Sequence, residues 1–213
     1  MPITDGAFAA LRQFARKRPA VESCELCSSE LAAEHQHLID PAARKITCAC
    51  DACAILFSGQ HAARYKRVPR NARMIPNFKM TDAQWDSLMV PIEMAFFLRN
   101  GGDGKVAAFY PGPAGAIESL LSLEAWVEIE GDNPGVGNME ADVEALLVNR
   151  VGAARGVAAQ YYIVPIDECY RLVGLIRLNW HGLSGGTEVW REVTKFFASL
   201  KEKSPTTSEE AHA

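Results

Sequence analysis

The chain has 213 residues, of which 48% are hydrophobic and 23% are charged, and its formal net charge is −4. This length and composition suit one sizeable core, or a small module attached to a larger domain. No apolar run reaches the roughly 18 residues that a membrane-spanning helix needs, and the N-terminus lacks the pattern of a secretory signal. We therefore expect a cytoplasmic protein without a membrane span, and the charge gives no reason to expect a nucleic-acid partner.

Residues 1–20 are expected to hold an N-terminal helix. Apolar side chains recur at helical spacing from Phe8 to Phe14, and Pro19 follows a basic run that suits the end of a helix. We expect this helix to pack on the rest of the protein without a chemical role.

Five of the six cysteines lie within residues 21–60, a segment that we predict to be a separate module. Cys24 and Cys27 form one C-x-x-C pair, Cys50 and Cys53 form a second, and 22 residues separate the pairs. Two such pairs at a spacing of roughly 15–20 residues, here slightly exceeded, are typical of a four-thiolate metal site. Because the cytoplasm is reducing, metal binding is favoured over disulfides. The pattern predicts a zinc-ribbon-like module with these four cysteines as ligands.

The residues between the two pairs are expected to form a hairpin. Residues 37–39 and 45–47 have the composition of short strands, and the sequence Asp-Pro-Ala-Ala at 40–43 suits the turn between them. The apolar residues 54–57, which follow the second pair, are expected to dock on the main domain.

Cys48 is the alternative to Cys50 as the third ligand, since the two share a face if their segment is a strand. We prefer Cys50 because it keeps the spacing to Cys53, and we expect Cys48 to be a small buried residue beside the site. His35 and His37 are alternative metal ligands. Because four thiolates complete the shell, we expect these histidines instead on the strand surface or as hydrogen-bond donors around the ligands. Zinc is the favoured metal, and iron or an iron–sulfur cluster stays open.

Residues 61–90 are expected to be a basic linker followed by a short helix. The basic run at residues 64–73 is short and holds one aromatic residue, so it suits a solvated linker better than a nucleic-acid surface. Thr81 and Gln84 have the spacing of a capping box, at a helix expected to end near Leu88.

Residues 91–203 are predicted to form an α+β domain with an antiparallel sheet and C-terminal helices. The expected strands are 94–98, 105–110, 144–148 and 161–164. A helix is expected to open after Pro113, to continue through Leu123 and to end at the loop of residues 131–135. Asp167 is expected to cap a later helix. A turn at residues 181–186 separates that helix from the last one. Residues 204–213 are polar and expected to be disordered.

No catalytic residue is predicted. The sequence lacks the glycine-rich phosphate-binding loops and the zinc-protease helix motif. Cys169 lies on the apolar stripe of its helix and is expected in the core. His181 and Asp167 lie at opposite ends of one helix, roughly 20 Å apart, which is too far for an acid–base pair.

Several motifs, in chain order, resemble one uncharacterised bacterial protein family. They run from about Cys24 to Leu200 and include CELC, EHQHLID, CACDACAILF, AFYPGPAGAIESLL, VPIDECYRLVGLIRLNW and HGLSGGTEVW. Members of that family are often encoded beside genes of high-affinity uptake nickel–iron hydrogenases. The resemblance implies an accessory role in hydrogenase assembly or function, with a hydrogenase subunit or maturation factor as the partner.

The sequence and the resemblance together favour a non-catalytic accessory protein with a structural metal site. Two alternatives stay open. One is a redox protein that carries electrons through a cysteine-ligated iron or iron–sulfur centre. The other is a zinc ribbon that binds nucleic acid through the basic run.

Overall fold

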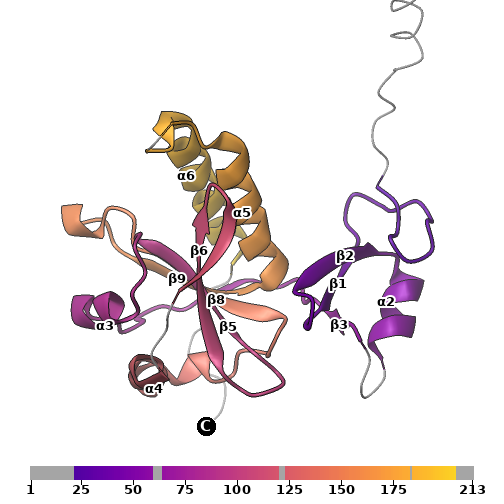
Figure 1. Ribbon diagram of the computed structural model, residues 1–213, viewed down its shortest axis with the longest axis horizontal. Coiled ribbons are helices and arrows are strands. Elements are labelled where there is room, and N and C mark those ends of the chain that lie inside the picture. The colour runs from indigo at the N-terminus through magenta and orange to yellow at the C-terminus, as the bar shows by residue number, and fades with distance from the viewer. Residues whose placement is uncertain (1–21, 60–63, 120–122, 183, 205–213) are drawn as a thin grey trace, which may run out of the picture.

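The fold is α+β, as predicted, with a small three-stranded sheet and a larger six-stranded one. The computed structural model describes residues 22–59, 64–119, 123–182 and 184–204. The helix expected within residues 1–20 and nearly all of the tail expected to be disordered lie outside these ranges. Within them, no helix combines the length and the apolar character needed to cross a bilayer. Figure 1 shows the small sheet with one helix at one end of the molecule, and the larger sheet with its helices at the other.

The small sheet is built on the predicted hairpin, which the structure confirms. Strand β1 (Gln36–Asp40) pairs antiparallel with β2 (Lys45–Ala49), and β3 (Lys66–Arg67) pairs with the other edge of β1. The Asp40 carboxylate accepts a hydrogen bond from the backbone N–H of Ala43 at 3.2 Å, which holds the turn closed. Helix α2 (Asp51–Ser58) follows β2 almost directly.

The large sheet is antiparallel throughout and has the strand order β4-β9-β8-β5-β6-β7. It confirms the four predicted strands and adds an edge strand at each side. In chain order the strands are β4 (Arg73–Met74), β5 (Met94–Arg99), β6 (Val106–Gly112), β7 (Gly115–Ser119), β8 (Glu144–Asn149) and β9 (Gln160–Pro165).

The prediction of a helix opening after Pro113 is wrong, because residues 115–119 form β7. Gly112 pairs with Gly115, so a two-residue turn sends the chain straight back along β6. Gly115 has φ = +129°, a conformation that side-chain-bearing residues rarely adopt, and the glycine therefore fits this turn. The helix begins later, as α4 (Leu123–Asp132).

Alternating side chains of the large sheet face two separate apolar layers. Phe96 and Leu147 pack with the two long C-terminal helices, α5 (Ile166–Asn179) and α6 (Gly186–Lys203), both of which were predicted. Their strand neighbours Phe97 and Leu146 pack on the opposite face, with Trp85 and Trp126. Figure 1 shows α5 and α6 on one side of the sheet and α3 and α4 on the other.

Helix α3 (Asp82–Ser87) has the predicted capping box. The N–H of Gln84 donates to the Thr81 hydroxyl at 3.1 Å, and the N–H of Thr81 donates to the Gln84 side chain at 2.8 Å. Two single turns of 3₁₀ helix, Pro134–Val136 and Ala153–Arg155, complete the regular elements of the described residues. Cys169 is fully buried among apolar residues, as expected.

The basic run is more structured than a solvated linker, because it supplies β3 to the small sheet and β4 to the large one. Its cations pair with carboxylates that lie at the small sheet and at the large sheet. Arg64 donates to Asp40 at 2.7 Å, Lys66 lies 2.7 Å from Asp142, and Arg73 donates to the buried Glu144 at 2.5 Å. The segment therefore fastens the two sheets together.

The hairpin itself also docks on the large sheet. Ile39 belongs to the same buried cluster as Phe96, and Ile46 packs against that cluster from β2. From the turn between the two strands, Arg44 donates to Glu118 at 2.9 Å and lies 5.0 Å over the ring of Phe109. One face of the hairpin thus packs against the large domain.

Candidate metal centre

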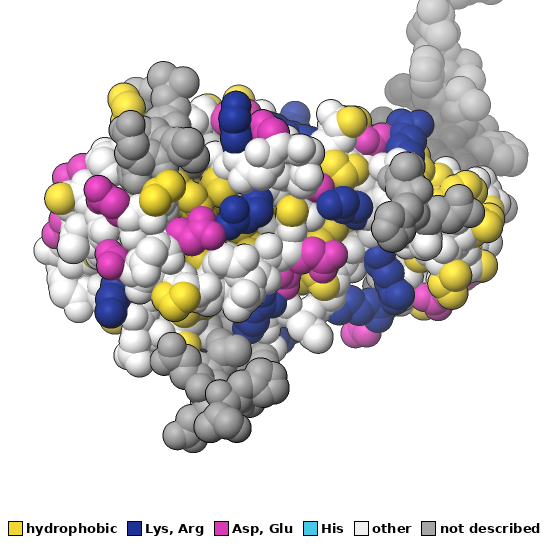
Figure 2. All heavy atoms as spheres, turned by 90° about the horizontal axis from the view of Figure 1, so that it is seen from below, with side chains coloured by type: hydrophobic (Ala, Val, Ile, Leu, Met, Phe, Trp, Pro, Cys, Tyr) yellow, Lys and Arg dark blue, Asp and Glu magenta, His cyan; other side chains and the backbone are white. Residues whose placement is uncertain are grey.

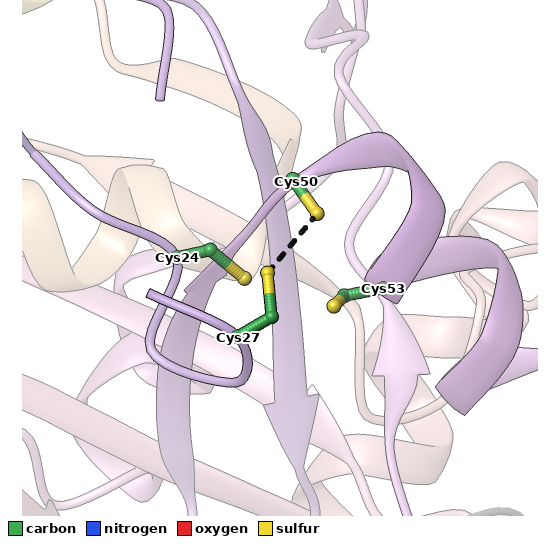
Figure 3. A group of neighbouring side chains, drawn as sticks. All are labelled: Cys24, Cys27, Cys50 and Cys53. Atoms are coloured by element: carbon green, nitrogen blue, oxygen red, sulfur yellow. Dashed lines mark hydrogen bonds between the residues drawn. The ribbon is translucent and has the colours of Figure 1, made fainter. Parts of the chain in front are cut away.

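The four cysteines predicted as ligands converge at one end of the small sheet. Cys24 and Cys27 lie in the loop before β1, Cys50 occupies the N-cap position of α2, and Cys53 lies in the first turn of that helix. Their four sulfurs lie within 4.8 Å of one another. Figure 3 shows the four side chains pointing toward a common centre. The second pair lies at the start of a helix, which was not predicted from the sequence.

Backbone hydrogen bonds shape the loop that carries the first pair. The N–H of Cys24 donates to the carbonyl of Ser29 at 2.8 Å, and the N–H of Ser28 donates back to the carbonyl of Cys24 at 2.7 Å. Ser28 adopts φ = +63°, which turns the chain sharply after Cys27. This tight turn brings both sulfurs to the same side of the loop.

The spacing of the sulfurs fits a metal ion. Four Zn–S bonds of about 2.3 Å in a tetrahedron place neighbouring sulfurs about 3.8 Å apart. Cys27 and Cys50 have a sulfur–sulfur distance of 3.7 Å, which the dashed line in Figure 3 marks. A disulfide would need about 2.05 Å, and all six cysteines are free thiols.

Two of the four thiols have a lowered pKa, which favours their thiolate forms. Burial alone would raise the pKa of Cys24, but backbone N–H groups, led by that of Cys50, lower it from 9.0 to about 6. A backbone hydrogen bond from Cys53 lowers the pKa of Cys50, with help from the Ser29 hydroxyl. Cys50 also lies at the positive N-terminal end of the α2 dipole, which favours a thiolate.

The pKa of Cys53 is shifted in the opposite direction. Burial raises its pKa to about 12, and the hydrogen bonds that its thiol makes with neighbouring sulfurs add to this effect. Crowded thiolates repel one another, so without a cation one member of the group keeps its proton. A divalent ion would remove this conflict, because a metal replaces thiol protons when it binds.

The thiols belong to a small apolar cluster of their own. Cys24 and Cys53 are buried together with four other side chains, Leu31, Leu38, Ala49 and Ala54. Leu38 is on the opposite face of β1 from Ile39, so the hairpin separates this small cluster from the core of the large domain.

Cys48 is not part of the four-sulfur group, which contains Cys50 instead. Cys48 pairs in register with His37, and a second group consists of these two residues and His35. The sulfur of Cys48 and one nitrogen from each histidine lie within 4.8 Å of one another. Burial, with the negative charge of Glu25 beside it, raises the pKa of Cys48.

Asp167 has a role that the sequence did not suggest. It was expected to cap α5, but Pro165 holds the N-cap position, without a side-chain hydrogen bond. The Asp167 carboxylate accepts a hydrogen bond from Nδ1 of His37 at 2.6 Å, across 130 residues of chain. This contact raises the pKa of His37 and joins the hairpin to α5.

The expected docking of residues 54–57 on the large domain is wrong for its three largest side chains. Ile55, Leu56 and Phe57 are 70%, 65% and 41% exposed. Only Ala54 turns inward, toward the thiols. Figure 2 shows hydrophobic side chains gathered at the end of the molecule that carries α2.

A large cavity lies elsewhere, between the ends of β8 and β9 and helix α6. It measures about 670 Å³, and its lining includes Val151, Trp190 and Phe197 together with Arg155 and Lys201. No histidine, cysteine or carboxylate occurs among its described lining residues. The chemistry-bearing side chains therefore gather around the hairpin and not in this cavity.

Comparisons with known proteins assign the chain to a family without assigning an activity. The model of a family of unknown function (DUF5947) matches residues 23–204, which include the module and the α+β domain. No curated protein and no solved structure matches the chain.

Proposed function

The chain belongs to this family of unknown function, and from that premise we propose that it is a non-catalytic accessory protein. A zinc ion held by Cys24, Cys27, Cys50 and Cys53 stabilises a module that binds a protein partner. The partner is a subunit or a maturation factor of a nickel–iron hydrogenase, a choice that rests on the resemblance of the sequence motifs. The site of action is the cytoplasm, where thiols stay reduced.

The observation that carries the proposal is the exposed apolar surface of α2, which three consecutive residues form. The helix starts at two of the four thiols, and its next residues include Ile55, Leu56 and Phe57, which face solvent. Single exposed apolar residues are ordinary, but a contiguous apolar patch is a frequent mark of a protein interface. The metal would fix the first turn of α2 and so hold this patch in place.

The coordination chemistry supports a structural role for this ion. Four thiolates fill a tetrahedral shell and leave no position for a substrate, which is the usual arrangement of structural zinc. The sulfur–sulfur distance of 3.7 Å between Cys27 and Cys50 is compatible with that shell.

The contacts of the basic run argue against the nucleic-acid alternative. Arg64, Lys66 and Arg73 each pair with a carboxylate of the protein itself. A phosphate backbone would have to compete with these pairs for the same cations.

The test is a pull-down from anaerobic cells that express a hydrogenase, with wild-type protein and two variants. Leu56→Asp places a charge in the α2 patch, whereas Leu178→Asp makes the same change at a site on α5 that is 82% exposed. Wild type and Leu178→Asp should recover a hydrogenase or maturation subunit, and Leu56→Asp should recover it at least about tenfold less well. Equal recovery by both variants, or recovery of nucleic acid alone, would contradict the proposal.

A further inference from the structure

We propose that His35, His37 and Cys48 form a second metal site, which shares no ligand with the four thiols. Its ion would be a borderline-soft transition metal such as zinc, bound by two imidazoles and one thiolate. The fourth position would stay open. This proposal is independent of the accessory role.

Strand geometry brings the three side chains together. Side chains two residues apart lie on the same face of a strand, so His37 shares its face with Ile39, and His35 immediately precedes the strand at the same spacing. Cys48 is the direct partner of His37 across the hairpin. The two imidazole rings lie 4.9 Å apart, at 86° to each other, so they do not stack face to face.

His35 has a buried nitrogen that lacks a partner. Its Nδ1 lies 3.0 Å from the carbonyl oxygen of Ala32, and because a carbonyl only accepts, Nδ1 carries the proton. Nε2 then presents a lone pair, yet it is buried without any hydrogen-bond partner. The side chain is only 8% exposed. Leaving such a group unsatisfied destabilises the folded protein, and a metal ion would satisfy it.

His37 is held in a similar way. Its Nδ1 donates to the Asp167 carboxylate at 2.6 Å, which leaves Nε2 as the ligating nitrogen. Histidines that bind metals almost always donate their other ring N–H to a carboxylate or a backbone carbonyl. Here the Asp167 carboxylate accepts from His37, and the backbone carbonyl of Ala32 accepts from His35. Asp167 is thus a positioning residue for the proposed site.

The three side chains need only a small movement to surround one ion. A tetrahedral site with bonds of about 2.0–2.3 Å places ligand atoms roughly 3.4–3.6 Å apart. The sulfur of Cys48 and one ring nitrogen from each histidine now lie within 4.8 Å of one another. Side-chain rotations that move the ligand atoms by about an ångström would bring them to these distances. Imidazole and thiolate together suit zinc or copper better than magnesium or calcium, which prefer oxygen.

The proposed site is next to a cleft between the small sheet and the large domain. Both histidines line this cleft, which measures about 360 Å³ and is also lined by Arg70, Glu168 and Lys203. Water or a small ligand could therefore approach the open position. We expect this ion to exchange more readily than the one enclosed by four thiolates.

The test is equilibrium dialysis of the full chain against zinc, followed by elemental analysis. Wild type should bind two ions, one of them more weakly. Cys48→Ser and His35→Gln should each lose the weaker ion and keep the tighter one, which also shows that the module is still folded. His181→Gln, at an exposed histidine outside the cluster, should bind as wild type.

Asp167→Asn adds a readout that a purely structural role would not change. It should weaken the affinity for the second ion by about 10–100-fold, because residues that hydrogen-bond to metal-bound histidines have effects of that size. The affinity for the first ion should stay unchanged. The proposal is overturned if wild type binds a single ion. It is also overturned if Cys48→Ser binds as many ions as wild type.

Discussion

The two parts of the molecule are stabilised in different ways. The large sheet has an apolar layer on each face, with aromatic residues such as Phe96 and Phe97 packed against helices. The small apolar cluster holds six buried residues, and two of these are the thiols Cys24 and Cys53. A core of that size cannot offset the conformational entropy of its chain. The large domain should therefore fold by burial alone, whereas the module should depend on its metal.

The strongest way to separate the two parts is to remove one ligand. Structural zinc contributes about 10–16 kcal/mol of apparent binding free energy in small zinc modules, so Cys24→Ser should abolish tight metal binding. Hydrogen exchange of the β1 and β2 amides should accelerate strongly, while the amides of β5 and β8 stay protected. Protection of the hairpin that is independent of metal would show that the module has a sufficient core of its own.

The converse change is made in the large domain. Leu147 is fully buried in its core, and truncating such a leucine usually costs about 2–5 kcal/mol. Leu147→Ala should lower the urea midpoint of the large domain and leave the metal content unchanged. The control Leu178→Ala, at an exposed site on α5, should change stability by no more than about 0.5 kcal/mol. Loss of metal in the Leu147 variant would mean that the two parts unfold as one unit.

A smaller effect on stability is expected at helix α3 of the large domain. The hydroxyl of Thr81 caps α3, a short helix that buries Trp85 against the sheet. Thr81→Ala should cost about 1 kcal/mol in urea unfolding, and Thr81→Ser should recover most of it, because serine supplies the same hydroxyl. Equal stability of the two variants would show that the cap contributes little here.

Local patterns made part of the structure predictable. The turn at residues 40–43 and the paired strands follow from turn residues and alternation, and the thiol group follows from the spacing of the two pairs. The helix expected around Ile117 failed because its apolar spacing was compatible with both periods, and the glycine turn decided for a strand.

The remaining features depend on contacts that no local pattern encodes. The pair formed by His37 and Asp167 joins residues 130 positions apart. The grouping of Cys48 with the histidines requires the register of the hairpin, which a shift of one residue would have reversed. Strand β4 has only two residues and lies in a basic run, so neither alternation nor composition indicated it.

The identity of the metal at the four thiols decides between a structural zinc module and an electron-carrying centre. Protein purified anaerobically should be analysed for zinc and iron, and its absorption spectrum should be recorded in the visible range. We predict a colourless protein that contains zinc and no iron, since zinc has a filled d shell and forms closed four-thiolate sites. Visible absorption with stoichiometric iron would contradict a structural zinc module and support an electron-carrying centre instead.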